Sequence, residues 1–178
     1  MPRVHSFPPI VAADAQILIL GTMPGVASLE AGQYYGHPRN HFWPIMEALF
    51  EMPGGLAYEQ RCDALRQARV AVWDVLQSCQ REGSLDSAIA PESVVANDYT
   101  SLLFRCPDLK TIAFNGQKAS ALFRRHVFRF NHSGGQDATP VKGTYADLRY
   151  LQLPSTSPAY ASMTLMQKTH RWRAVLDI

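Results

Sequence analysis

The segment QYYGHPRNHFWP, residues 33–44, combines flat rings with polar tips. His37, Asn40 and His41 stand there among aromatic side chains, shortly after the glycine-rich turn GTMPG. The amide of Asn40 can orient a water molecule by hydrogen bonding, although it is not a base near neutrality. Asn is also a common N-cap, and a helix is predicted from His41 onward. The segment is therefore either a helix start or the wall of a pocket for a flat ring.

Other segments carry groups that suit a phosphate backbone. LPSTSPAYASM, residues 153–163, places three successive hydroxyl side chains between two prolines, and hydroxyls and loop N–H groups are good phosphate contacts. RRHVFRFNH, residues 124–132, and KTHRWR, residues 168–173, mix basic and aromatic side chains, as nucleic-acid-binding surfaces do. The first segment is equally consistent with a capped turn, and RRHVFRFNH with the solvated end of an amphipathic helix.

The candidate segments follow predicted β-strands. Four short runs predict strands at residues 16–21, 70–75, 110–116 and 148–154. The first three are largely apolar, as expected for strands buried on both faces, and the fourth is mixed enough for a sheet edge. Ligands of open parallel sheets bind beyond the carboxyl ends of the strands. Because the ends GTMPG, WDVLQS, FNG and LPSTSP are all small or polar, a binding site is predicted at that edge.

Helical patterns alternate with these strands, which predicts an α/β protein with a parallel sheet covered on both sides. The predicted helices span residues 41–51, 58–68, 93–105, 117–126 and 164–176. Residues 131–145 are predicted to form a long surface loop. The length of 178 residues favours one domain, residues 1–178.

Composition and charge exclude several classes of protein. The chain is 47% hydrophobic and 18% charged, which is typical of an ordered globular domain, and its net charge of +2 identifies no acidic partner. The apolar runs are too short to span a bilayer, and the stretch MPRVHSFPPIV lacks a signal-peptide core. Cys62, Cys79 and Cys106 lie too far apart for a zinc or iron–sulfur site. We therefore expect a cytoplasmic protein without a metal or a membrane partner.

Taken in order, four motifs resemble the uracil-DNA glycosylase superfamily: LGTMPGVASLEAGQYYGHPRNHFWPIMEALF, VWDVLQSCQREGSLDSAI, FNGQKA and LPSTSPAYASM. The resemblance is greatest to its hypoxanthine-DNA (deoxyinosine) glycosylase branch, and the mismatch-specific uracil/thymine glycosylases are also near. It implies a three-layer α/β/α sandwich with a central four-stranded parallel sheet. It further implies a monomeric, monofunctional enzyme without a cofactor, nucleoid-associated when bound to DNA. Such an enzyme flips a deaminated base into a pocket and hydrolyses its N-glycosidic bond.

Two positions depart from the pattern of that family. Met23 stands where most members carry an Asn or Asp that activates water. In the hypoxanthine branch this role belongs to the Asn of the N-H-F-W segment, so the resemblance implies that Asn40 is the catalytic, water-positioning residue. Leu153 stands where the uracil-specific enzymes carry a His that donates to the leaving base. Another group must therefore stabilise the leaving base here.

The resemblance also implies a base pocket and DNA contacts. Asp74 stands where relatives carry an Asn that reads the base. An ionised carboxylate can accept a hydrogen bond from N1–H of hypoxanthine or from N3–H of uracil. Adenine carries an acceptor at N1, so it cannot make this bond. From the residues alone, Asp74 is equally a strand-end cap, and Tyr34 and Tyr35 are equally core. Tyr160 is expected to fill the vacated base stack. The predicted base pocket comprises Gly21, Met23, Pro24, Gly25, Tyr34, Tyr35, Phe42, Asp74 and Asn115. The predicted DNA contacts are Ser155, Thr156, Ser157, Pro158, Ala159, Tyr160, Arg124, Arg125 and Lys168.

Three alternative functions stay open on the sequence. The first is a uracil or mismatch glycosylase that does not act on hypoxanthine. The second is a non-catalytic nucleic-acid-binding module of the same fold, which Met23 and Leu153 favour. The third is a nucleotide-binding hydrolase that uses Ser155 and His170, although the chain lacks the G-x-S-x-G elbow of that class.

Overall fold

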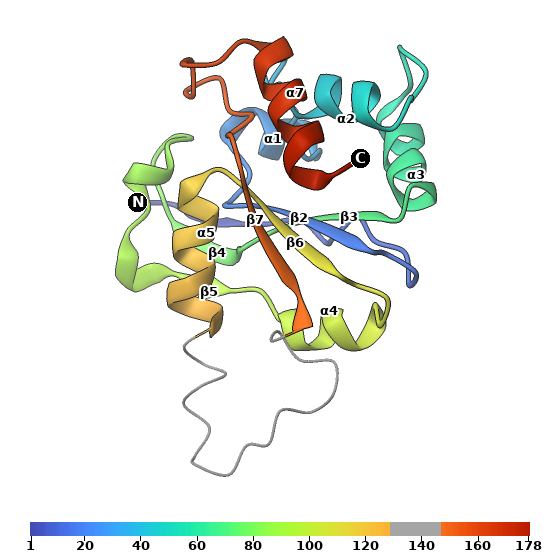
Figure 1. The fold of residues 1–178 in the computed structure, drawn as a ribbon. Helices are drawn as coiled ribbons and strands as arrows, with labels where there is room; N and C mark the ends of the chain where they lie inside the picture. The colour runs from blue at the N-terminus through green and yellow to red at the C-terminus, as the bar shows by residue number, and fades with distance from the viewer. Residues whose placement is uncertain (129–146) are drawn as a thin grey trace.

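A parallel sheet of four strands lies at the centre of the described part of the chain (Figure 1). This computed structural model describes residues 1–128 and 147–178. The strand order is β3 (Val70–Asp74), β2 (Ile17–Gly21), β6 (Thr111–Asn115) and β7 (Arg149–Leu153). Gly21 pairs with Asp74, and Asn115 with Leu153, so the carboxyl ends of the strands are level. All four predicted strands are present, and the mixed strand β7 lies at an edge, as expected.

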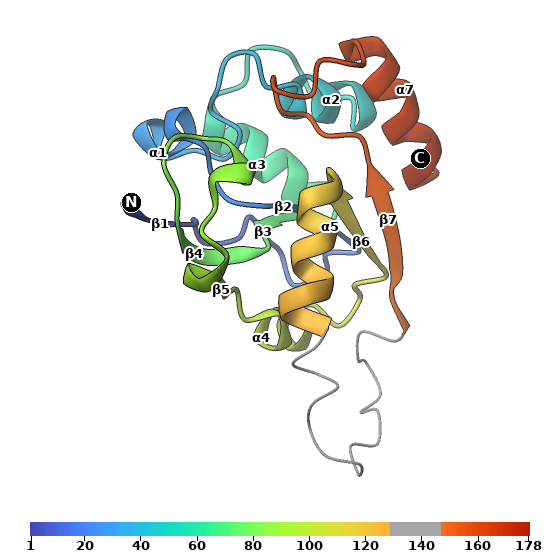
Figure 2. The ribbon, with the colours of Figure 1, turned by 90° about the vertical axis from the view of Figure 1, so that its left-hand side faces the viewer.

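Helices cover both faces of this sheet and complete three layers (Figures 1 and 2). One face carries α2 (Phe42–Leu49), α3 (Tyr58–Gln67) and α7 (Leu165–Leu176). The other face carries α4 (Tyr99–Arg105) and α5 (Gln117–Phe123). Successive side chains of a strand point to opposite faces, so Ile19 of β2 packs with the first group while Leu18 and Leu20 pack with the second. The predicted three-layer sandwich is confirmed.

The helix predicted over residues 93–105 begins later than expected. Ser93 instead ends a short turn, η2 (Pro91–Ser93), and its hydroxyl accepts from one backbone N–H and donates to a backbone carbonyl. α4 starts after Asp98, whose carboxylate accepts a hydrogen bond from the N–H of Ser101. Local bonds of this kind compete with the helix and favour turns and caps.

A second, antiparallel sheet lies beside the first, and the sequence pattern does not predict it. Its strand order is β1 (Arg3–His5), β4 (Leu76–Gln80) and β5 (Val95–Ala96). The stretch WDVLQS was expected to be a polar strand end, but only Val75 separates β3 from β4. Strands of two and three residues are too short to carry a period, which explains why β1 and β5 were missed.

Short helical segments complete the described chain. α1 (Val26–Ala31) and η1 (Asp86–Ala88) were not predicted. The helix predicted to end at residue 126 leaves α-helical geometry after Phe123 and continues as a π-helical turn, η3 (Arg124–Phe128). The loop predicted at residues 131–145 lies outside the described residues.

Candidate active site

The carboxyl ends of the four parallel strands border one cavity of about 430 Å³. Gly21 ends β2, Asp74 ends β3 and Asn115 ends β6, while Ser155 follows β7. The structure thus brings the four polar strand ends together at the predicted edge. The cavity is lined by Gly21, Met23, Pro24, Gly25, Tyr34, Tyr35, Asn40, Asp74, Asn115, Ser155, Thr156, Ser157, Pro158, Ala159 and Tyr160, all predicted from the sequence.

Two predicted site residues lie behind the lining. Phe42 is fully buried and stacks on Tyr35, with ring centroids 3.8 Å apart and planes 16° apart, so it supports the pocket wall. Lys168 was expected to be an open phosphate contact, but it is only 1% exposed. Its ammonium group donates to the carbonyl of Tyr160 at 2.9 Å and lies 5.2 Å from the ring centroid. Lys168 therefore holds the loop at residues 158–163 from beneath.

The predicted basic patch is not brought to the cavity. α5 begins beside Asn115, and Arg124 and Arg125 follow its other end, near α4 (Figure 2). The rest of that patch, which includes Arg129, Phe130 and His132, lies outside the described residues. Basic side chains nearer the cavity are Arg39, which precedes Asn40, and Lys118. Burial raises the pKa of the cavity-lining Asp86, and the charge of Lys118 is among the effects that oppose this rise.

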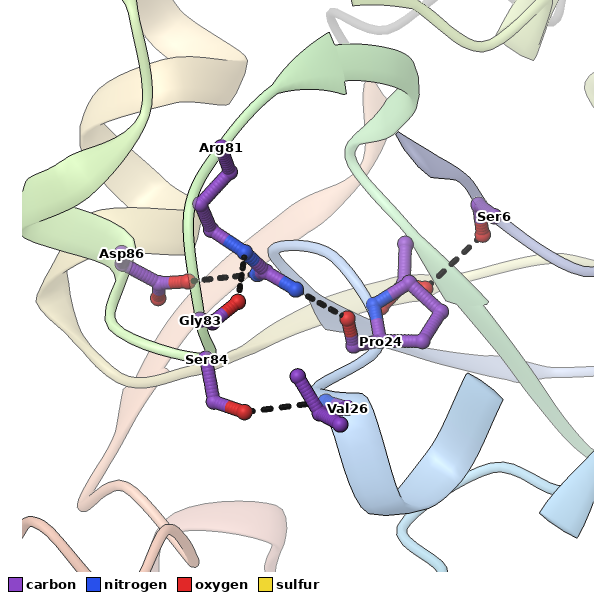
Figure 3. A network of polar contacts seen from close by, with 8 residues as sticks. Ser6, Pro24, Val26, Arg81, Gly83, Ser84 and Asp86 are labelled. Atoms are coloured by element: carbon purple, nitrogen blue, oxygen red, sulfur yellow. Dashed lines mark hydrogen bonds and ion pairs between the residues drawn. The ribbon is translucent and has the colours of Figure 1, made fainter. Parts of the chain in front are cut away.

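One wall of the cavity comes from residues that the sequence did not single out. Arg81 is buried and donates to the carbonyls of Pro24 and Gly83, and it forms an ion pair with Asp86 at 3.8 Å (Figure 3). The hydroxyl of Ser84 accepts from a backbone N–H of α1 at 2.9 Å. These bonds hold the GTMPG turn against the 83–87 segment. Thr22, Ala27 and Ser28 also line the cavity, as does His37, which stands in the QYYGHPRNHFWP segment but was not assigned to the base pocket. The remaining lining residues, which the sequence did not predict, are Ser84, Leu85, Asp86 and Ser87.

The position of Asn40 is consistent with both roles that the sequence left open. Its Oδ1 accepts from the backbone N–H of Phe42 at 3.0 Å, at the start of α2, and the same side chain lines the cavity. Because an N–H requires an acceptor, this bond also identifies which amide atom is the oxygen. An amide oxygen has two lone pairs, so one remains for a water molecule. Capping and water positioning are therefore compatible.

Asp74 is a buried carboxyl group, 3% exposed, beneath the cavity. The hydroxyl of Ser6 donates to its Oδ2 at 2.8 Å. Its backbone carbonyl accepts from the Asn97 amide at 2.8 Å and from the Tyr99 hydroxyl at 2.6 Å, which fixes the end of β3. Burial raises the pKa of Asp74 to about 7, and the hydrogen bond from Ser6 opposes that shift. The group can therefore change protonation near neutrality.

Gly21 allows polar atoms to approach one another at the floor of the cavity. A Cβ at this position would lie 2.5 Å from Asp74 Oδ1 and 3.0 Å from the Tyr35 hydroxyl. A contact of 2.5 Å is too short for a carbon atom, so a side chain here would displace Asp74. The missing side chain leaves Asp74 Oδ1 and the Tyr35 hydroxyl facing the same point.

The N-terminal segment and the loop after β7 close the cavity from two sides. The carbonyl of Phe7 accepts from the Tyr34 hydroxyl at 3.0 Å and from the Trp73 indole at 3.1 Å. On the other side, Asn115 donates to the hydroxyl of Thr156 and accepts from its N–H, both at 2.9 Å. The Asn115 amide thus holds the loop, and one N–H and one lone pair remain for other partners.

Within residues 1–128 and 147–178, no group of three or more His, Cys, Asp or Glu side chains is arranged to hold a metal ion. No helix in these ranges combines the length and apolar character needed to cross a membrane.

Comparison with known proteins assigns the chain to a family. A sequence model of the Uracil DNA glycosylase superfamily matches residues 8–178. The chain belongs to the uracil-DNA glycosylase superfamily. Two similar curated proteins of this kind are named hypoxanthine DNA glycosylase. The one from Methanosarcina barkeri is 38% identical over 66% of this chain and 73% of its own length. The one from Methanosarcina acetivorans is 40% identical over 65% of this chain and 72% of its own length.

A solved structure extends the likeness to the whole fold. The solution NMR structure of a candidate uracil DNA glycosylase from Methanosarcina acetivorans superposes with a TM-score of 0.74 at 30% identity. The match covers 98% of this chain and 96% of the other. The family that the sequence motifs predict is thereby confirmed.

Proposed function

We propose that this protein is a monofunctional DNA glycosylase that removes hypoxanthine from DNA containing deoxyinosine. The observation that carries the proposal is the cavity at the strand ends, which places Asp74 and Asn40 in one pocket. The curated relatives named hypoxanthine DNA glycosylase support the choice of base. We further propose that the protein acts as a single-domain monomer in the cytoplasm, and needs neither metal nor cofactor.

The pocket would read the flipped base through Asp74. Ser6 occupies Oδ2, which leaves Oδ1 to accept from N1–H of hypoxanthine. Adenine offers an acceptor at that ring position and would be rejected. Uracil offers a donor at N3, so this contact admits it, and uracil remains the second candidate base.

Asn40 would position the attacking water. Breaking the N-glycosidic bond leaves an oxocarbenium-like sugar, which water can attack without a strong base if it is held in place. The hydroxyls of Ser155 and Ser157 would contact phosphates. Thr156, expected to be a further phosphate contact, is only 1% exposed and is bonded to Asn115, so it supports the loop instead. Tyr160 is 40% exposed at the rim of the cavity, a position from which its ring can fill the space that the flipped base leaves.

Replacement of Asn40 by Ala tests the proposal. We expect the single-turnover excision of hypoxanthine to fall about 10²–10³-fold, the usual effect of losing one preorganised polar group. The variant also loses the bond to the first N–H of α2, next to the N-cap residue His41, and a loss of this kind costs about 1 kcal/mol of stability. Asp98→Ala is the matched control, since it removes a cap from α4 but no cavity-lining side chain. Excision and thermal unfolding should be measured on the same preparations.

The control separates the two roles of Asn40. Asp98→Ala should lose comparable stability while its folded fraction excises hypoxanthine at the parent rate. If Asn40→Ala and Asn40→Asp also retain the parent rate, Asn40 is only a cap. A parallel assay on DNA containing deoxyuridine decides between hypoxanthine and uracil as the preferred base.

A further inference from the structure

Tyr35 is held in an unfavourable backbone conformation. Its φ is 55°, in the left-handed region that bulky residues rarely occupy. Stacking against the buried ring of Phe42 fixes its side chain in this conformation. Backbone strain of this kind persists where the surroundings impose it, and it concentrates at functional sites.

The hydroxyl of Tyr35 is buried at the cavity and makes no hydrogen bond of good geometry within the described ranges, although the Asn115 side chain lies close enough to oppose the rise in its pKa. The polar groups around it are engaged elsewhere. Asn115 is bonded twice to Thr156, and Oδ2 of Asp74 accepts from Ser6. An unsatisfied buried hydroxyl is destabilising in the free protein, so its position calls for a ligand atom that completes it.

The position of this hydroxyl defines what it can bind. It and Asp74 Oδ1 lie 3.0 and 2.5 Å from the point where Gly21 lacks a Cβ. One donor and one acceptor therefore pack against Gly21 at the floor of the cavity. A lactam edge, which is a ring N–H beside a carbonyl oxygen, complements this pair. Hypoxanthine and uracil present that edge, whereas adenine presents the reverse pattern, an acceptor beside an amino donor.

Burial, reinforced by the charge of Asp74, raises the pKa of Tyr35 far above its ordinary value. The phenol therefore keeps its proton near neutral pH and remains a donor.

We propose that the Tyr35 hydroxyl donates a hydrogen bond to the exocyclic carbonyl oxygen of the flipped base and stabilises that base as it leaves. This inference rests on the proposed glycosylase function. It supplies the group that the apolar side chain of Leu153 cannot, because Leu153 is buried and has no donor.

The chemistry balances without a change in Tyr35. The bond between the base nitrogen and the sugar carbon C1′ breaks, and its electron pair leaves with the base. The negative charge spreads onto the carbonyl oxygen, where the hydrogen bond from Tyr35 strengthens. Water supplies a hydroxyl group to C1′ and releases a proton to solvent, and the departing base takes up a proton from solvent. Tyr35 keeps its own proton throughout.

The proposed hydrogen bond is tested by comparing the parent protein and one variant on two substrates that differ in the carbonyl oxygen. Tyr35→Phe retains the ring that stacks on Phe42 and removes only the hydroxyl. Single-turnover excision should be compared on DNA containing deoxyinosine and on DNA containing purine deoxyriboside, whose base lacks the carbonyl oxygen. We expect the substitution to slow excision of hypoxanthine about 10²–10³-fold and that of purine less than about threefold. Equal slowing of both substrates, or of neither, overturns the proposal.

Tyr58→Phe is the matched control. This substitution also removes a phenolic oxygen, which is half-buried and accepts from the backbone N–H of Tyr34 at 3.0 Å, but Tyr58 does not line the cavity. Its substitution should lower the melting temperature and leave the preference between the two substrates unchanged. Tyr35→Phe should melt no lower than the parent protein, because its hydroxyl makes no hydrogen bond of good geometry among the described residues. A marked loss of stability in Tyr35→Phe would show a structural bond and overturn the assignment.

Binding to uncleavable DNA distinguishes failure of this inference from failure of the proposed function. The probes are duplexes with a 2′-fluorinated deoxyinosine and with its analogue lacking the carbonyl oxygen. If the parent protein excises nothing but prefers the first probe, and Tyr35→Phe loses that preference, the contact stands and the glycosylase function fails. If the parent protein excises hypoxanthine and Tyr35→Phe does so equally well, the function stands and the contact fails. If the parent protein neither excises nor discriminates, both fail.

Discussion

Replacing Asp74 by Asn isolates the effect of burying an ionisable group under the cavity. The folded pKa of Asp74, about 7, lies above the value of about 3.9 in an unfolded chain. The folded state therefore binds more protons, and the free energy of unfolding falls as pH rises from about 4 to about 7. Three pKa units correspond to about 4 kcal/mol at 1.36 kcal/mol per unit. An Asn of the same shape has no such titration and can still bond to Ser6.

The expected result is a difference between the two proteins that depends on pH. Urea unfolding at several pH values should give nearly equal stabilities near pH 4. The Asn variant should become more stable as pH rises, by about 4 kcal/mol at pH 8. Other titrating groups are common to both proteins and cancel in the difference. A difference that stays constant between pH 4 and pH 8 would refute the assignment of the raised pKa to Asp74.

The same carboxyl group should control the pH profile of excision. Only the ionised group offers Oδ1 freely to a base N–H, so the rate should rise with pH through about 7 in the parent protein. The excision rate of Asp74→Asn should not change with pH around 7. Ser6→Ala removes the bond that lowers the pKa of Asp74, so both the stability difference and the rate should shift to higher pH. An unmoved midpoint in Ser6→Ala would contradict the role of that bond.

Three further outcomes follow from the site. Arg39→Gln combined with Lys118→Gln should reduce the slope of log affinity against log salt concentration by about two phosphate contacts. Neutralising Arg124 and Arg125, at the far end of α5, should leave that slope unchanged. A reduced slope in the second variant would place the basic patch in the DNA interface. Tyr160→Ala should slow excision from duplex DNA more than from single-stranded DNA, since only a duplex closes its stack; equal slowing would argue against a wedge. Excess chelator should leave base release intact, and metal-restored activity would contradict this.

The strands and most helices could be predicted because they repeat a simple pattern along the chain. β2 alternates between two buried faces, and the polar residues that follow each parallel strand must meet at one edge. Asp74, Asn115 and Ser155 were therefore predictable as neighbours. The 83–87 segment was not, because it reaches the cavity only through β4 and the buried Arg81, and neither has a local signature.

Lys168 shows why residue type can mislead. It lies four residues before Trp172 and eight before Leu176, on the buried stripe of α7. Its spacing predicts burial, whereas its charge indicated an exposed phosphate contact. The bond to the carbonyl of Tyr160 reconciles the two, and it depends on how the loop folds back on the helix. Similarly, the strained conformation of Tyr35 depends on the position of Phe42, and the residue types alone do not reveal it.

The two closing sides of the cavity come from distant parts of the chain. Ser6 and Phe7 hold one wall, and Thr156 holds the other through Asn115. Contacts between such distant residues form late in folding, because a long loop must close first. A chain still on the ribosome, with β7 not yet released, therefore has no complete base pocket. The base pocket is therefore complete only after β7 and the loop that follows it have been synthesised.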